Sequence, residues 1–268
     1  MSKNLILKEM KRNLKDFLTG SLIIISLLLM TMGMYSSMEE NMALISELYS
    51  KMPKFLLEAI NFRQDQWTSI LGFYLTYFVY YIPLMGSVFS IYLGTKILSN
   101  EEQNKTAEFL LSRPLTREQI ISSKLLVLSF YILGINVLAF FSGMICCGII
   151  SDWEINIHSL IVLHTYGFLL CLFFGVLGFF ITVLMKRAKA IIGTGIILVM
   201  GLYFFDMIIR ISNNFKFLLY LTPFKYLDLR ILTQNYDFEV WRLIVFIGSS
   251  GILIFLSFMF YRRKDILI

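Results

Sequence analysis

Residues 155–185 read INIHSLIVLHTYGFLLCLFFGVLGFFITVLM and contain no Asp, Glu, Lys or Arg. An α-helix needs roughly 20 consecutive apolar residues to cross the hydrocarbon core of a bilayer. This stretch is therefore long enough to span, and it predicts a membrane helix over about residues 157–185.

Five further stretches of the chain also lack charged residues. Of all 268 residues 57% are hydrophobic and 16% are charged, whereas about a quarter are charged in a soluble domain. We therefore predict an all-α integral membrane protein that forms one domain over residues 1–268. Its six spans are expected at about 17–37, 68–95, 125–150, 157–185, 190–209 and 243–261.

Lys and Arg are distributed unevenly among the segments that connect these spans. Segments 1–16, 96–124, 186–189 and 262–268 together hold 16 of the 24 Lys and Arg residues. Positive residues near span ends are retained in the cytoplasm, so both termini are predicted to be cytoplasmic. The net charge of +6 then reflects topology and does not indicate a nucleic-acid partner. The first apolar run is long enough to span, so we expect no cleavable signal peptide.

The three cysteines lie in apolar spans and show no metal-ligand spacing with a histidine, so neither a metal site nor a disulfide is expected. They belong instead to stripes of small residues at every fourth position, which let membrane helices approach closely. The stripes are Ala139, Gly143 and Cys147, and Gly167, Cys171 and Gly175. They predict contact between spans three and four, and leave open whether they face the same chain or a second subunit.

Ionisable residues are nearly absent from the spans, although ion-coupled transporters usually place one near the membrane centre. The candidates are Asp206, Arg210, His158 and His164. Asp206 and Arg210 are four residues apart, so we expect them to pair on one helix face in a structural role. The chain has no GxxxxGK[ST] nucleotide-binding motif and no expected catalytic residue. Any energy source for uphill transport would lie in another chain.

The predicted cytoplasmic loop between spans two and three, residues 96–124, reads KILSNEEQNKTAEFLLSRPLTREQIISSK. Ser99 and Glu102 match a capping box, in which each side chain satisfies a backbone N–H at a helix start. Pro114 should end that helix, because the residue before a proline is pushed out of the α region. The loop therefore predicts a short helix over residues 99–113.

Thr116 and Gln119 form a second capping box, which should start the helix that continues as span three. Within the short helix, Ala107, Leu110 and Leu111 make an apolar stripe. Such a stripe suits either the bilayer surface or a soluble partner. Because the element is capped and joined to two spans, we favour a partner that pushes on it.

Residues 1–16 alternate apolar and basic side chains with helical spacing, which predicts an interfacial helix with its cations toward anionic lipid. Before the last span, residues 215–221 read FKFLLYL and are followed by Pro223. This run is too apolar for an open loop and too short to span, so it predicts a re-entrant segment over residues 213–230.

Span two is up to 30 residues long, or roughly 45 Å if helical throughout. It should protrude into the cytoplasm, with a kink at Pro83. Tyr77 and Tyr81 share a helical face with Tyr74 and are candidates for a substrate path. The alternative is the aromatic belt of a membrane interface, which we favour for Tyr74.

The cytoplasmic loop also carries a family resemblance, on Glu101, Glu102, Thr106, Leu110, Leu111, Pro114, Arg117 and Lys124. This pattern resembles the E…GT…LL..P..R……K signature of permease subunits in the type-2 ATP-binding cassette (ABC) exporter superfamily. Lys105 departs from it, since such permeases often have glycine there. Six spans with both ends inside, a basic amphipathic amino-terminal helix and a re-entrant segment are also features of that family.

The resemblance implies that residues 99–113 form a coupling helix that docks in a groove of a separate ABC ATPase. The implied contacts are Glu101, Glu102, Thr106, Phe109, Leu110, Leu111, Arg113, Pro114 and Arg117. It also implies an outer gate formed by Leu221, Pro223, Phe224 and Tyr226. The chain itself would hold no cofactor, because ATP and Mg²⁺ would bind the ATPase.

The sequence thus predicts the transmembrane subunit of an ATP-driven exporter in the bacterial cytoplasmic membrane. Two ATPase copies and a second permease copy or a paralogue would complete it. Its apolar spans suit an amphipathic or hydrophobic cargo, such as an antimicrobial or toxin peptide, a lipid-like molecule or a drug. Two alternatives stay open: a membrane sensor or assembly protein whose loop binds a regulator, and an ATP-independent carrier that uses Asp206.

Overall fold

The computed structural model describes residues 3–59, 69–104, 106, 115–185, 188–211, 213–227 and 238–263. Of residues 42, 43, 76, 188–190, 213 and 214 it describes the backbone alone. All regular elements in these ranges are helical, and six helices are long and apolar enough to cross a membrane, which confirms the six-span prediction. The elements are α1 (Lys3–Gly33), α2 (Tyr35–Glu40), α3 (Met42–Lys51), α4 (Lys54–Ala59), α5 (Ile70–Tyr81), η2 (Ile82–Gly86), α6 (Ser87–Gln103), α8 (Arg117–Ile150), α9 (Ile157–Leu184), α10 (Ala188–Ile211), η3 (Asn213–Leu221), η4 (Pro223–Tyr226) and α11 (Val240–Arg263).

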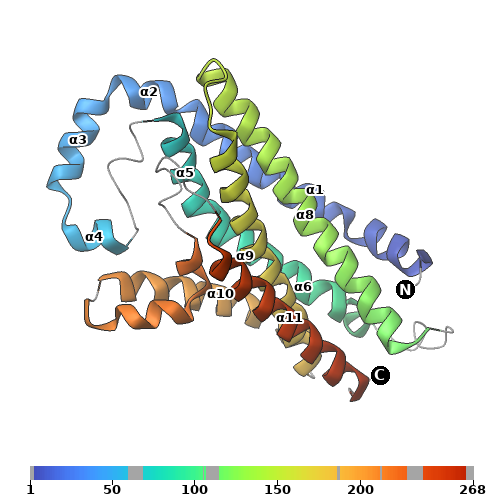
Figure 1. Cartoon of the computed structure of the whole chain (residues 1–268). Coiled ribbons are helices and arrows are strands. Elements are labelled where there is room, and N and C mark those ends of the chain that lie inside the picture. The colour runs from blue at the N-terminus through green and yellow to red at the C-terminus, as the bar shows by residue number, and fades with distance from the viewer. Residues whose placement is uncertain are drawn as a thin grey trace.

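The long helices form one bundle with two distinct ends (Figure 1). α9 lies at its centre and contacts α6, α8 and α11, while α1 packs along α8 and α10 along α6. Both termini and the facing ends of α6 and α8 lie at one end. The arch of α2, α3 and α4 lies at the other, where α4 contacts α10. This arrangement places the start of α1, the end of α6, the start of α8 and the end of α11 on a common side.

Glycines let α6 and α9 approach so closely that their backbones are in contact. A Cβ atom added at Gly94 would collide with the carbonyl oxygen of Gly175, and one at Gly178 would lie 2.6 Å from that of Ile91. A Cβ at Gly175 would also lie 2.6 Å from Ile132 of α8. The predicted contact between spans three and four is therefore present. Both small-residue stripes face neighbours in the same chain, since that of α8 meets α5.

Pro83 interrupts the second span, as predicted. α5 passes into the π-helical turn η2, which contains Pro83, before α6 begins. Proline has no backbone N–H and its ring clashes with the preceding turn, so an unbroken α-helix is disfavoured there.

The capping box predicted from Ser99 and Glu102 is wrong, because α6 runs on through both residues to Gln103. The Ser99 hydroxyl instead accepts a hydrogen bond of 2.9 Å from the Gln103 side chain, inside the helix. Residues 99–103 thus belong to the second span's helix. Of the rest of the predicted coupling helix, residues 105 and 107–113 lie outside the described residues.

The amino-terminal segment is not a separate element, since α1 continues from it into the first span without a break. Near its start, Leu5, Glu9 and Asn13 are buried, whereas Leu7 and Leu14 are exposed. Arg12, expected to face anionic lipid, instead pairs with acidic groups inside the bundle. Glu9, Arg12 and Asn13 therefore pack against protein, whereas Lys8, Lys11 and Lys15 of the same helix are exposed.

The segment after α10 forms two 3₁₀ elements, η3 and η4. Phe224 of η4 is buried, and its ring stacks on Phe174 of α9 at 5.3 Å and meets Tyr203 of α10 edge-on at 5.4 Å. These contacts fix η4 to the bundle. Re-entry of the segment into the bilayer stays a prediction.

Candidate functional site

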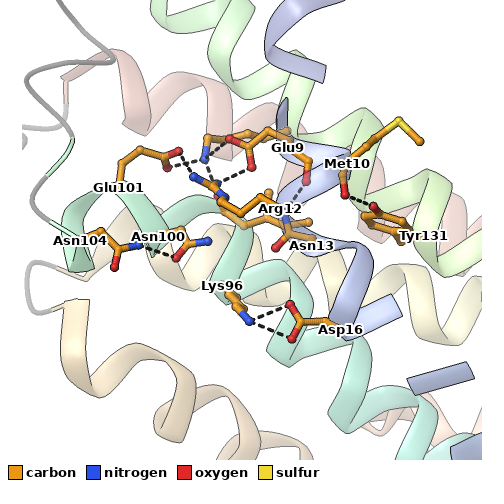
Figure 2. Close-up of polar contacts among 12 residues, drawn as sticks. Glu9, Met10, Arg12, Asn13, Asp16, Lys96, Asn100, Glu101, Asn104 and Tyr131 are labelled. Carbon is orange, nitrogen blue, oxygen red and sulfur yellow. Dashed lines mark hydrogen bonds and ion pairs between the residues drawn. The ribbon is translucent and has the colours of Figure 1, made fainter. Parts of the chain in front are cut away.

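Four charged side chains from three helices meet at the bundle end that carries both termini (Figure 2). Arg12 of α1 donates to Glu101 of α6 at 2.6 Å and also pairs with Glu9. Lys124 of α8 lies 2.5 Å from Glu101 and 3.4 Å from Glu9, and donates to the carbonyl oxygen of Ile97. We call Glu9, Arg12, Glu101 and Lys124 the charge cluster. It joins α1, α6 and α8 with two positive and two negative groups.

The charge cluster is largely removed from solvent. The side chains of Glu9 and Lys124 are 0% and 1% exposed, and that of Glu101 is 5% exposed. Because a buried charge is unfavourable without a partner, the three helices must stay together to keep each charge paired. The cluster lies outside the predicted spans. Burial opposes ionisation of Glu101, but Lys124 and Arg12 outweigh it and lower its pKa to about 2. At Glu9 burial outweighs Lys124 and raises the pKa.

The second predicted capping box is confirmed and positions Lys124. The Thr116 hydroxyl accepts from the Gln119 amide at 3.2 Å, and the Gln119 side chain accepts from the Thr116 amide at 3.1 Å. This cap satisfies backbone N–H groups that a helix start leaves unpaired. Lys124 follows it by about two turns, and its amine points at Glu101.

A second set of polar contacts holds α1 beside the charge cluster. The amine of Lys96 on α6 lies 2.7 and 2.9 Å from the two carboxylate oxygens of Asp16. Tyr92, one turn earlier, donates to the same carboxylate at 3.1 Å. The hydroxyl of Tyr131 on α8 donates to the carbonyl oxygen of Met10. α1 therefore contacts α6 through two ion pairs, Arg12–Glu101 and Asp16–Lys96, and its backbone accepts a hydrogen bond from α8 (Figure 2).

The start of α8 is also fixed to the end of α11. Arg117 donates to the carbonyl oxygens of Tyr261 at 3.0 Å and Arg262 at 3.3 Å. The last carbonyls of a helix have no partner within it, and a cation there also interacts favourably with the negative end of the helix dipole. Arg262 in turn lies 2.5 Å from Glu118.

The described part of the predicted ATPase contacts divides into buried and accessible residues. Glu101, one of the implied ATPase contacts, is buried in the charge cluster. Glu102 is half-buried, and Thr106 is exposed with its amide 2.9 Å from the Glu101 carbonyl oxygen. Arg117 is occupied with α11. Phe109, Leu110, Leu111, Arg113 and Pro114 lie outside the described residues.

Sequence reasoning did not select Glu9 and Arg12 as candidates, and it used Lys124 only for the resemblance. A signal was present, because Leu5, Glu9 and Asn13 recur every four residues and so share one face of α1. An acid and an amide on the buried face of a basic helix indicate a polar partner within the protein.

The candidate gate residues lie at the opposite end of the bundle. Leu221 is 72% exposed, and Pro223 begins η4. Phe224 is buried as described above. The carbonyl oxygen of Tyr226 accepts from Arg242 of α11 at 3.1 Å, and its hydroxyl donates to the Tyr220 carbonyl at 2.8 Å. The segment therefore contacts three of the six long helices.

The candidate path tyrosines lie inside the bundle. Tyr77 is buried and donates to the carbonyl oxygen of Ile24 on α1 at 2.7 Å, and the half-buried Tyr81 ring lies 5.1 Å from it. Tyr74 is buried and lies 2.7 Å from His164 of α9. Tyr74 is thus an interior residue and not part of a lipid-facing belt.

One family model matches this chain over nearly its whole length. It is described as ABC-2 family transporter protein, and the match covers residues 4–266. The matched range includes the charge cluster and all three groups of candidate residues. No curated protein matches the chain.

Proposed function

Because the chain belongs to the ABC-2 transporter family, we propose that it is the transmembrane subunit of an ATP-driven exporter. It is a multi-pass membrane protein whose family implies a separate ABC ATPase chain. In the proposed complex, two permease copies, or one copy and a paralogue, bind two ATPases in the bacterial cytoplasmic membrane. ATP and Mg²⁺ bind only to the ATPases, and both permease termini face the cytoplasm.

The observation that carries the proposal is the charge cluster at the base of the loop between α6 and α8. The loop carries the family signature, and its two flanking helix ends are held by Glu101 and Lys124. Arg12 and Glu9 connect the same point to α1. A docked ATPase that moves this loop therefore moves the end of α6, the start of α8 and the first helix together, since separating them would leave buried charges unpaired.

In this proposal the loop residues divide into two roles. Phe109, Leu110 and Leu111 make the apolar contact with the ATPase, and Glu102, Thr106, Arg113, Pro114 and Arg117 border it. Glu101 is a positioning residue, because its carboxylate is occupied by Arg12 and Lys124. Nucleotide binding closes the two ATPases and draws the two loops of the dimer together.

Movement at the cytoplasmic end has a route to the opposite end. η4 rests on α9, α10 and α11 through Phe224 and Tyr226, so displacement of these helices moves the proposed gate. Tyr77 donates to α1, so Tyr77 and Tyr81 become a substrate path only when α1 and α5 separate. This conformational step links the first helix to cargo passage.

The proposed cargo is amphipathic or hydrophobic, such as an antimicrobial or toxin peptide, a lipid-like molecule or a drug. The apolar character of the spans supports this class, because a small inorganic ion needs charged or polar groups along its path. Substrate would leave between the two permease copies.

The test is co-purification of an ATPase with the tagged chain in mild detergent. We expect the wild-type chain to recover ATP-hydrolysing activity, and the double variant Leu110→Asp/Leu111→Asp to lose at least tenfold of it. Two carboxylates placed in an apolar docking contact would be buried without partners.

A matched control carries the same change at the other end of the bundle. Leu44 and Leu48 of α3 are exposed, so Leu44→Asp/Leu48→Asp should recover the ATPase like wild type. If no ATPase accompanies the wild-type chain, or the loop variant retains it, the exporter proposal fails and a membrane sensor becomes the better reading.

A further inference from the structure

A small cavity lies beneath α4, between α5, η2, α10 and η4. Its volume is about 40 Å³, and its polar lining residues are Tyr80, Tyr203, Asp206 and Arg210. About 10 to 15 Å³ open to a water-sized sphere is enough to hold one water molecule, so the cavity admits a small polar group and excludes a whole amphiphile.

The acid and base in this cavity neutralise each other, as the sequence predicted. Arg210 donates through Nε to Asp206 at 2.6 Å. Thr222, just before η4, donates to the other Asp206 oxygen at 2.5 Å. Asp206 is buried and both of its oxygens are engaged. The pair is therefore a fixed structural unit, and only groups outside the contact between Asp206 and the Nε atom of Arg210 can meet a ligand.

The groups that remain are donors. The Tyr80 hydroxyl is buried and has no hydrogen-bond partner in the part of the chain that the structure describes. Within the same residues, the guanidinium of Arg210 makes its hydrogen bond through Nε, and both terminal nitrogens are left to donate. A buried hydroxyl without a partner is unfavourable. A guanidinium fork suits the oxygens of carboxylate and phosphate groups. Both residues line the same small cavity.

The surroundings of the cavity are apolar. Its other lining residues are Ala59, Val79, Pro83, Met207, Phe224 and Leu227. On α10, Tyr203 and Met207 border the cavity and are half-buried, so part of each side chain belongs to the surface available to lipid. A ligand with a polar head in the cavity can therefore keep an alkyl tail against α10 in the bilayer.

We propose that this cavity binds the oxyanion headgroup, phosphate or carboxylate, of an amphiphile whose tail lies along α10. Arg210 and Tyr80 donate to the headgroup oxygens, and Asp206 orients the guanidinium. The source is a membrane phospholipid or a transported amphiphile, which share this chemistry. Binding requires only this chain, so its outcome is distinct from that of the exporter proposal.

The test is native mass spectrometry of the purified full chain with four probes at equal concentration. Dodecyl phosphate and dodecanoate should form one-to-one adducts, and dodecanol and inorganic phosphate should bind at least tenfold more weakly. Equal binding of dodecanol would overturn the proposal, because the headgroup charge would then be irrelevant. Equal binding of inorganic phosphate, or no adduct at all, would also overturn it, and the cavity would hold an ion or water only.

Two conservative variants test the assigned donors. Tyr80→Phe removes one hydroxyl, and Arg210→Lys keeps the positive charge beside Asp206 while removing the guanidinium fork. Each variant should weaken the binding of dodecyl phosphate at least fivefold. The control is Tyr35→Phe, which makes the same hydroxyl deletion in helix α2 at a buried residue that does not line the cavity. This variant should bind dodecyl phosphate like wild type. Unchanged binding by both cavity variants, with wild-type size-exclusion profiles, would contradict the assignment.

Lipid analysis of the purified chain separates the two sources. A phospholipid that co-purifies with wild type and is lost in Arg210→Lys identifies a membrane lipid as the ligand. Adducts with the added probes, but without a co-purifying phospholipid, identify a soluble or transported amphiphile. Both results support the oxyanion site.

Discussion

Lys124 is a lysine whose amine is entirely enclosed and whose partners come from two other helices. Its replacement by methionine keeps the approximate length but leaves Glu9 and Glu101 with Arg12 alone. Removing one member of a buried ion pair costs about 3 to 5 kcal/mol, because the remaining charge is uncompensated. We expect Lys124→Met to lower the unfolding midpoint in detergent clearly, as measured by a thermal scan of intrinsic fluorescence.

The control for that prediction is Lys51→Met. Lys51 pairs with Glu47 at 2.5 Å, but both side chains are more than half exposed. Exposed pairs contribute between about 0 and 1 kcal/mol, so this variant should unfold close to wild type. Equal shifts in the two variants would refute the role given to burial.

The residues that could be predicted are those whose partners are near in sequence. Asp206 and Arg210 are one turn apart, and Thr116 and Gln119 fit a known cap, so spacing alone identified both pairs. Arg12 and Glu101 are 89 residues apart, and only the packing of α1 against α6 and α8 unites them. Periodicity gives the buried face of a helix, but it does not give the partner of that face.

Among the helices, the pair α6 and α9 makes a sharp prediction about packing. In Gly94→Ala the new methyl group would collide with the Gly175 carbonyl oxygen, so the two backbones must separate. Overpacking of this kind costs about 1 to 3 kcal/mol. We expect a lower unfolding midpoint and a lower yield of monodisperse protein by size exclusion.

A matched glycine is available on α11. At Gly251 an added Cβ would meet no atom within 4 Å, so Gly251→Ala should leave both measurements unchanged. A Gly94→Ala variant that behaves in the same way would show that α6 and α9 are not in close contact.

Element existence followed from the sequence more reliably than element boundaries. Charge-free runs identified all six spans, because a bilayer imposes a minimum apolar length. The ends differ, since α1 begins near the N-terminus and α6 continues to Gln103. Ser99 matched a cap motif, yet it lies inside α6. The contact of Glu101 with Lys124 stabilises the continuation of this helix beyond Ser99.

For the molecule as a whole, the distribution of charge predicts one orientation in the membrane. Thr106 is exposed near the charge cluster, shortly before the start of α8. Trp153 is exposed in the turn between α8 and α9, just beyond the other end of α8. In a background without native cysteines, Thr106→Cys should react with an impermeant maleimide only in inverted vesicles. Trp153→Cys should react only in intact cells. The reverse pattern would place the proposed ATPase site on the wrong side.

The charge cluster also has a consequence for biosynthesis. α1 is made before α6 and α8, yet the carboxylate that Arg12 binds lies 89 residues later, and Lys124 lies another 23 residues beyond that. While the ribosome is still producing the second span, Glu9 and Arg12 have only each other. α1 therefore reaches its final position only after α8 has begun to emerge, so a helix that is made before both of its partners is completed in its packing after them.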